Sequence, residues 1–170
     1  GTLDPMATGI LAIALGEATK TVPYAMDAEK TYRFTATWGE SRDSDDTEGP
    51  VTGVSDKRPS GAEIEAVLPS FVGVLNQTPP AYSAIKVAGE RAYDLARDGE
   101  AVVLEPRQVE VYEARLLAAE TDQAEFEILC GKGTYVRSWV RDIARTLGTL
   151  GHVSALRRTR LGSWSEKDAV

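Results

Sequence analysis

The chain has 170 residues, of which 42% are hydrophobic and 26% charged, and these ordinary globular proportions exclude the disordered, collagen-like and disulfide-scaffold classes. Its net charge of −7 argues, on its own, against a nucleic-acid partner. One cysteine, no apolar leader and no apolar stretch near the roughly 20 residues that span a bilayer predict a cytoplasmic protein that does not enter a membrane.

The N-terminal elements are expected to be two short helices followed by a strand. The chain opens on Gly1 without an initiating methionine, so we expect a fragment of a longer protein. Apolar residues three and four positions apart predict helix over residues 7–26, and Gly16 and Pro23 divide that stretch into two helices. Residues 30–38 alternate with period two, which predicts a strand with one buried face.

The middle of the chain is less regular. Residues 40–59 are rich in Asp, Ser, Thr, Gly and Pro and are expected to form a long loop that ends in a short strand over residues 51–54. Ser60-Gly-Ala-Glu63 matches a capping box and predicts a helix that runs to Phe71. A further helix is expected from Glu90.

Two strands and a helix are expected in the C-terminal half. The strands cover residues 109–117 and 124–130, and an amphipathic helix covers residues 138–147. Strands and helices are mixed without a regular alternation. The sequence therefore predicts one α+β domain with a mixed, largely antiparallel central sheet and flanking helices.

Charge is distributed unevenly along the chain. Residues 131–162 contain seven basic residues and one acidic residue, a local net charge of +6 that leaves −13 for the rest. Arg137, Arg141 and Arg145 recur at four-residue intervals, so they share one face of the expected helix. A solvated charged face is one explanation, but the absence of acidic residues between them on that face favours contact with phosphates.

Few residues are available for metal or nucleophilic chemistry. With His152 and Cys130 as its only histidine and cysteine, the chain lacks the ligand cluster of a zinc or other transition-metal site. His152 is expected at the surface or facing RNA rather than in a catalytic triad. Neither glycine-rich phosphate-binding motif is present, so nucleotide hydrolysis and dinucleotide redox chemistry lose support.

Asp4 is the most conspicuous candidate for carboxylate chemistry. Pro5 biases the backbone of Asp4 towards an extended conformation, so the carboxylate would project from a rigid loop. The same pair also suits the start of a helix that Asp4 would cap. Tyr32 also has two possible roles. Its place on the same strand face as Phe34 and Trp38 fits core packing, whereas a tyrosine near a strand end can stack on a base.

Five short motifs, in this order, resemble the bacterial tRNA pseudouridine-55 synthase family across nearly the whole chain. They are Gly1-Thr-Leu-Asp-Pro-Met-Ala-Thr-Gly9, Gly16-Glu-Ala-Thr-Lys20, Lys30-Thr-Tyr-Arg33, Gly133-Thr-Tyr-Val-Arg137 and Leu156-Arg-Arg158. The resemblance implies a pseudouridine synthase-like catalytic domain over residues 1–170, without the family's N-terminal part or its C-terminal RNA-binding domain. It also implies a cytoplasmic, monomeric enzyme that isomerises uridine 55 in the T-arm loop of tRNA and uses no cofactor or metal.

The resemblance implies roles for individual residues. Asp4 is implied as the catalytic aspartate, Tyr32 as the residue that stacks on the target base, and Arg137 as the partner of Asp4. The other implied substrate-binding residues are Asp46, Tyr135, Leu156 and Lys20. Residues 80–108 match a thumb that closes on the RNA hairpin. The basic residues expected on the RNA backbone are Lys132, Arg141, Arg145, Arg157 and Arg158.

The implied reaction breaks the N1–C1′ bond of uridine and rejoins the uracil through C5. Asp4 could attack C1′ or C6, or act as a base at C2′, and the sequence does not choose among these routes. The uridine must first leave its stack, and an aromatic ring such as that of Tyr32 can replace the lost stacking. Arg137 would hold Asp4 ionised and oriented.

Three other functions stay open. Glycoside hydrolysis uses two carboxylates, and the acidic loop at residues 43–48 could supply a second beside Asp4. A non-catalytic RNA-binding or tRNA-folding module would use the basic face alone and would not need Asp4. A guide-RNA-dependent relative of the family is the third, although Gly16-Glu-Ala-Thr-Lys20 and residues 79–105 resemble the tRNA enzyme more.

Overall fold

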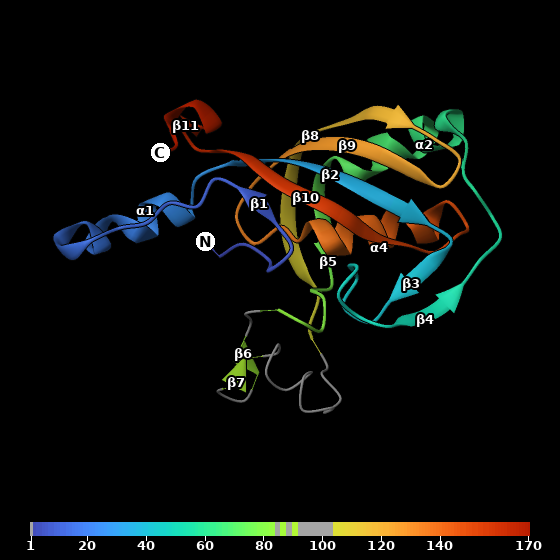
Figure 1. The fold of residues 1–170 in the computed structure, drawn as a ribbon, viewed down its shortest axis with the longest axis horizontal. Coiled ribbons are helices and arrows are strands. Elements are labelled where there is room, and N and C mark those ends of the chain that lie inside the picture. The colour runs from blue at the N-terminus through green and yellow to red at the C-terminus, as the bar shows by residue number, and fades with distance from the viewer. Residues whose placement is uncertain (1, 84–85, 88–89, 92–103) are drawn as a thin grey trace.

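The computed structural model describes residues 2–83, 86–87, 90–91 and 104–170 (Figure 1). A seven-stranded sheet lies at the centre of these residues, in the order β1-β10-β2-β9-β8-β5, and β11 pairs with β10. β1 (Thr8–Gly9) runs parallel to β10 (Gly151–Leu161), whereas the other neighbouring strands run antiparallel. The predicted α+β class with a largely antiparallel sheet is therefore confirmed.

The three strands predicted from period-two patterns are present. They are β2 (Lys30–Trp38), β8 (Arg107–Ala119) and β9 (Gln123–Cys130). Apolar side chains on alternate positions of β2 and β9 are buried, and the rings of Phe34 and Phe126 stack with centroids 5.6 Å apart. Alternation gives each strand one apolar face, which has to be covered by other elements.

Helices cover that face of the sheet. α4 (Val136–Thr146) buries its apolar stripe, and the Trp139 ring meets Phe126 edge-on with centroids 5.2 Å apart. α2 (Gly61–Val67) begins at the predicted capping box, because Ser60 Oγ accepts from the Glu63 amide and Glu63 accepts from the Ser60 amide. A 3₁₀ helix (Leu68–Phe71) continues α2. The core thus lies between one sheet face and these helices.

Three described strands of three or more residues, β3, β5 and β10, are absent from the sequence prediction. β10 lies inside the sheet between β1 and β2, but register shifts between Val153 and Ala155 and between Arg158 and Arg160 interrupt its period-two pattern. Such bulges hide a strand from an alternation test. β5 (Gly73–Gln77) is a sheet edge, and β3 (Glu40–Arg42) pairs with β4 (Val51–Val54), the short strand that was expected. The loop that these two strands enclose is called the acidic loop (residues 43–50).

The helix predicted for the first half of residues 7–26 is wrong. Thr8 and Gly9 form β1, and the Ile10 amide donates to the Arg158 carbonyl at 2.8 Å, so pairing with β10 displaces the helix. A 3₁₀ helix (Gly16–Thr21) and α1 (Val22–Met26) follow. Pro23 lies in the first turn of α1, where its missing amide costs nothing, and so starts that helix instead of breaking it.

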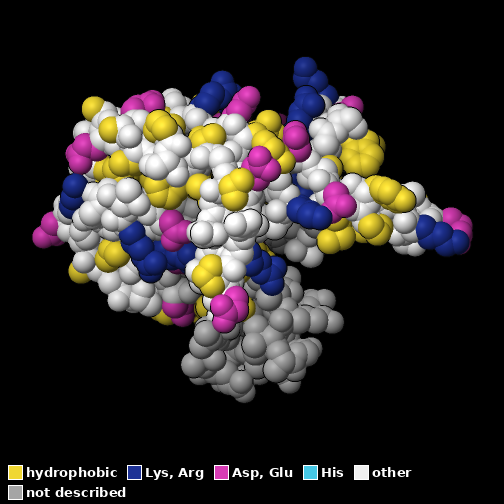
Figure 2. All heavy atoms as spheres, turned by 180° about the vertical axis from the view of Figure 1, so that it is seen from behind, with side chains coloured by type: hydrophobic (Ala, Val, Ile, Leu, Met, Phe, Trp, Pro, Cys, Tyr) yellow, Lys and Arg dark blue, Asp and Glu magenta, His cyan; other side chains and the backbone are white. Residues whose placement is uncertain are grey.

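Residues 11–26 form an arm that projects from the sheet (Figure 1). Figure 2 shows apolar side chains along this arm, and Ile13, Leu15 and Tyr24 are strongly exposed there. These three apolar side chains do not pack onto the core.

Most of the expected thumb, residues 80–108, lies outside the described residues. β6 (Lys86–Val87) and β7 (Glu90–Arg91) pair antiparallel, so the expected helix does not begin at Glu90, and its remainder lies outside the described residues. β11 (Trp164–Ser165) and a 3₁₀ turn (Glu166–Asp168) end the chain. No helix in the described part of the chain is long and apolar enough to cross a membrane.

Candidate active site

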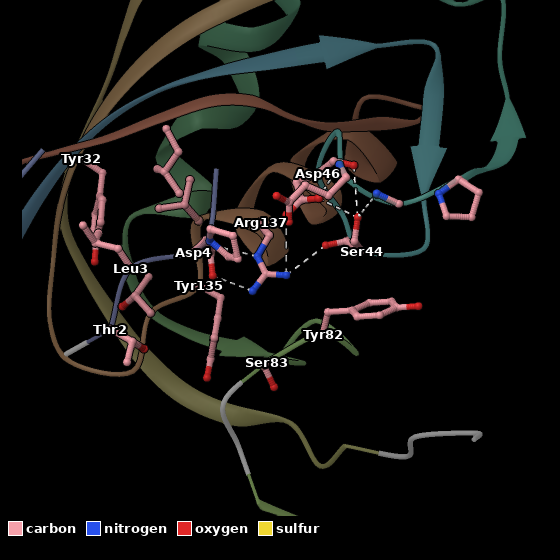
Figure 3. Close-up of a pocket in the computed structure, with 17 residues that line it drawn as sticks. Thr2, Leu3, Asp4, Tyr32, Ser44, Asp46, Tyr82, Ser83, Tyr135 and Arg137 are labelled. Carbon is pink, nitrogen blue, oxygen red and sulfur yellow. Dashed lines mark hydrogen bonds and ion pairs between the residues drawn. The ribbon is translucent and has the colours of Figure 1, made fainter. Parts of the chain in front are cut away.

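A cavity of about 460 Å³ opens between the N-terminal loop, the acidic loop, the start of α4 and the strands β2 and β10 (Figure 3). This volume suits a small ligand or a single flipped nucleotide. The sequence-predicted residues that line it are Asp4, Tyr32, Asp46, Tyr135, Arg137 and Leu156. Lys20 is not among them, because it is exposed on the arm and paired with Glu17.

Asp4 and Arg137 form a bidentate ion pair at the wall of the cavity. Nε of Arg137 donates to Oδ2 of Asp4 and Nη2 donates to Oδ1, both at 2.8 Å. The Arg137 side chain is only 4% exposed, whereas that of Asp4 is 26% exposed. The planar guanidinium therefore fixes the plane of the carboxylate while part of it stays open to the cavity. Asp4 does not cap a helix, because the next element is β1.

The acidic loop holds the remaining nitrogen of Arg137. Nη1 donates to the Ser44 carbonyl at 3.1 Å and lies 3.9 Å from Oδ2 of Asp46. The Ser44 hydroxyl and the Glu48 amide both donate to Oδ1 of Asp46, at 2.6 and 2.9 Å. Sequence reasoning misses Ser44, and no signal could have found this contact because any residue can supply a main-chain carbonyl.

Tyr135 is held at the start of α4 by a side chain from another strand. Gln77, at the end of β5, donates from Nε2 to the Tyr135 carbonyl at 3.0 Å and accepts from the Tyr135 amide at 2.8 Å. The Ser138 hydroxyl donates to the Thr78 carbonyl. Burial raises the pKa of the Tyr135 phenol. Gln77 carries no sequence signal, since it lies 58 positions before Tyr135 and only the fold brings the two together.

Tyr32 belongs to the core and to the cavity at once. Its side chain is 9% exposed, packs in the buried cluster beneath the sheet and also lines the cavity. Burial raises the pKa of the Tyr32 phenol, and the nearby Cys130 adds to this, whereas Arg158 lowers it. Core packing and contact with a bound base are thus compatible for this ring.

The basic residues expected on the RNA backbone do not form one free surface. Arg145 is exposed, as are Lys132 and Arg157, which pair with Asp27 and Glu166. Arg141 is mostly buried. It donates to Asp45, Asp142 and the Thr78 carbonyl.

Two expectations for polar residues of β10 are corrected by the fold. Arg158 is 1% exposed and its Nε donates to the Ile10 carbonyl at 2.8 Å, so it lies in the interior and cannot reach an RNA phosphate. His152, expected at the surface, is 2% exposed, and its Nδ1 lies 2.9 Å from the Glu40 carbonyl. Both errors follow from the unrecognised strand β10.

The described part of the chain contains no set of side chains placed to bind a metal ion. There, no group of three or more His, Cys, Asp or Glu side chains is placed to hold a metal ion. Cys130 is buried between the sheet and the helices, and burial raises the pKa of its thiol to about 11. A thiol with such a pKa is a poor nucleophile near neutral pH.

The chain matches two family models. Residues 1–136 match the TruB family pseudouridylate synthase (N terminal domain), and residues 137–170 match the tRNA pseudouridylate synthase B C-terminal domain. In the structure this boundary falls inside one folded unit, because α4 and β10 complete the core and the sheet that the first segment begins.

Curated relatives match over the whole chain. It is 57% identical to tRNA pseudouridine synthase B of Brucella melitensis and 59% identical to that of Bradyrhizobium diazoefficiens, in each case over 100% of this chain. The matched regions make up 53% and 50% of those two proteins. The chain therefore spans about half the length of the curated relatives it matches.

Solved structures share the fold. A chain of a crystallised Cbf5-Nop10-Gar1 complex superposes with a TM-score of 0.72 at 30% identity, over 98% of this chain and 40% of that one. A chain of an H/ACA RNP bound to a substrate RNA containing 2′-deoxyuridine gives a TM-score of 0.69 at 26% identity, over 98% and 38%.

Proposed function

The chain belongs to the TruB family of pseudouridylate synthases, and from this membership we propose that it carries the catalytic site of an enzyme that isomerises a uridine of tRNA to pseudouridine. The proposed target is uridine 55 in the T-arm loop, the substrate of the bacterial enzymes that the motifs resemble. The observation that carries the proposal is the bidentate Arg137–Asp4 pair, which presents one oriented carboxylate to a cavity of nucleotide size.

The proposed reaction proceeds in the cavity on a uridine that has left its stack. The uracil packs against the Tyr32 ring, with Tyr135 and Leu156 completing the walls. Asp4 acts on the nucleotide as nucleophile or base, the N1–C1′ bond breaks, and the rotated uracil forms the C5–C1′ bond. C5 then loses its proton with help from the Tyr32 hydroxyl, and N1 gains one. The reaction needs neither an electron acceptor nor a cofactor, because it is an isomerisation without a net change of oxidation state.

Arg137 acts through Asp4 in this proposal. All three of its guanidinium nitrogens are committed to Asp4 or to the acidic loop, so it holds the carboxylate rather than the substrate. Asp46 in turn braces Arg137 across the 3.9 Å gap to Nη1. A rigid support of this kind keeps the reacting oxygen in place while the uracil rotates.

RNA contacts outside the cavity fall to the exposed basic side chains. Arg145, Lys132 and Arg157 are exposed and can approach phosphates. We assign residues 80–108 as the segment that closes on the T-arm hairpin, on the basis of the family resemblance. The tRNA and the chain would meet as a one-to-one complex with a monomeric enzyme.

The alternatives fit the geometry less well. Glycoside hydrolysis needs a second available carboxylate, but the Asp46 side chain is 3% exposed and its oxygens are engaged by Ser44, Glu48 and Arg137. A binding module has no use for a carboxylate oriented towards a cavity. The 57% identity to a protein named tRNA pseudouridine synthase B favours the tRNA enzyme over a guide-RNA-dependent one.

Tritium release from tRNA that carries 5-³H-uridine tests the function directly, because isomerisation replaces the C5 hydrogen. Wild-type protein should release tritium, and Asp4→Asn should release none while binding tRNA within a few-fold of wild type. The matched control is Asp56→Asn, at an exposed position outside the cavity, and it should release tritium at the wild-type rate. An Asp4→Asn rate above a tenth of wild type contradicts the assignment, and release of free uracil would support glycoside hydrolysis.

A further inference from the structure

Tyr32 and Arg158 face each other across two neighbouring strands. In the antiparallel pairing of β2 and β10, Tyr32 lies directly opposite Arg158. Residues in such a pair point to the same face of the sheet, with Cβ atoms about 4.5–5.5 Å apart. Both side chains are buried, at 9% and 1% exposure, and the Arg158 guanidinium lies close enough to the phenol to lower the pKa of Tyr32.

Arg158 is also fastened to the segment that follows Asp4. Its Nε donates to the Ile10 carbonyl, and its own carbonyl accepts from the Ile10 amide, both at 2.8 Å. Gly9, at φ +99°, lets the two backbones approach this closely, because a Cβ at that position would lie 2.1 Å from the Arg158 carbonyl oxygen. One residue therefore connects the Asp4 loop to β2.

We propose that Arg158 is a positioning residue for the isomerisation, which holds the Tyr32 side chain against the cavity while it anchors the chain that follows Asp4. The inference rests on the proposed function, since Tyr32 is assigned to the uracil only there. Burying a guanidinium is costly unless its donors are satisfied, so its complete burial beside this phenol is a feature that core packing alone does not require.

The charged groups around Tyr32 give Arg158 a second effect. Burial of the ring, the Cys130 thiol of β9 and the Asp4 carboxylate raise the pKa of Tyr32, and the Arg158 guanidinium opposes them. Lys30, on the same strand face, directs its ammonium to the Met26 and Ala28 carbonyls instead. Arg158 is thus placed to favour the ionised phenol that accepts the C5 proton.

A double-mutant cycle on single-turnover tritium release tests this role. Arg158→Met should slow the chemical step at least about tenfold, because an opposite charge in contact typically shifts a pKa by one unit or more. In a Tyr32→Phe background the same change should cost less than about twofold, since Arg158 acts through the Tyr32 hydroxyl. Arg160→Met, at an exposed position on the same strand, is the matched control and should leave the rate unchanged.

The pH profile separates positioning from general support of the fold. Arg158→Met should move the rise of the rate with pH to higher pH, whereas Arg158→Lys should keep it near the wild-type position because the charge remains. Independent rate losses in the cycle together with an unmoved profile overturn the proposal. If Arg158→Met does not fold, the cycle is run with Arg158→Lys, which alters the donors but keeps the charge, and rate losses that add to those of Tyr32→Phe overturn the proposal. An inactive wild type would refute the proposed function itself, which is a distinct result.

Discussion

Helix α4 and strand β10 each carry three arginines, and each buries one of them almost completely. In α4, Arg137 is buried against the Asp4 carboxylate, whereas in β10 Arg158 is buried against the Ile10 carbonyl and the Tyr32 ring. The first guanidinium thus contacts a carboxylate, whereas the second contacts a main-chain carbonyl. The same residue type supports the acid of the site in one element and its tyrosine in the other.

The exposure of the arginines changes along α4 in a different way than along β10. Along α4 exposure increases from Arg137 through Arg141 to Arg145, since the acidic loop covers only the first turns. Along β10 it alternates, because Arg157 and Arg158 point to opposite faces of the sheet. The spacing of the arginines in the sequence indicates which of them share a face, but the neighbouring loop or strand determines whether that face is exposed to solvent.

The largest effect is expected from the buried end of α4. Arg137→Met should abolish tritium release and lower the free energy of unfolding by about 3–5 kcal/mol, because it strips the Asp4 and Asp46 carboxylates of their cation. Urea unfolding and the single-turnover rate measure the two effects. Arg137→Lys keeps the charge without the fork and should recover more stability than rate. Wild-type stability in Arg137→Met would show that the pair does not hold the loop.

Arg141 should matter for stability in a pH-dependent way. Burial raises the pKa of Asp45 and Arg141 lowers it, so Arg141→Ala leaves an ionised carboxylate in a poorly solvated place at neutral pH. The loss should be about 1–3 kcal/mol at pH 7, from urea unfolding.

The sign follows from linkage. Burial raises the pKa of Asp45 in the folded state above its value in the unfolded state. The cost of burying the ionised carboxylate therefore lowers the free energy of unfolding fully above the folded pKa, and this cost fades as the pH falls towards the unfolded pKa. Unfolding at pH 4 should therefore show a smaller loss than at pH 7. The double variant Arg141→Ala, Asp45→Asn is the control, and its loss should not depend on pH. An equal loss at both pH values in Arg141→Ala would exclude Asp45 as the cause.

At the exposed end of α4 the effect should shift from folding to RNA binding. Arg145→Ala should leave stability within about 0.5 kcal/mol of wild type. It should lower the slope of log K against log salt by up to about 1, for tRNA and for unrelated hairpins alike. Arg141→Ala should change this slope less, because its guanidinium is committed to acids and a carbonyl. An unchanged slope in Arg145→Ala would make it a solvated surface residue.

A small effect on folding is also expected beside Arg158. Arg157 is exposed and paired with Glu166, and surface pairs contribute little. Arg157→Ala should change the free energy of unfolding by less than about 1 kcal/mol in urea, whereas Arg158→Ala should cost several times more. Similar losses for the two would mean that the alternation along β10 does not govern their energetics.

Local patterns in the sequence were sufficient for the elements whose patterns are regular. The alternation of residues 30–38, the capping box at Ser60 and the apolar stripe of α4 predicted three elements that are present, because each depends on neighbours only a few residues apart. The motif around Asp4 and the one around Arg137 likewise identified residues that line the cavity, through resemblance to a family.

Tertiary structure alone decided the rest. Register shifts in β10 interrupt its alternation, so the sequence does not predict this strand. The burial of Arg158 and His152 is therefore not predicted either. The clamp of Gln77 on Tyr135 joins residues 58 positions apart, and Ser44 serves through a carbonyl that any residue has. Burial and long-range partners are properties of the packed chain, and in this protein they determine which arginine holds the Asp4 carboxylate, which faces Tyr32 and which remain exposed.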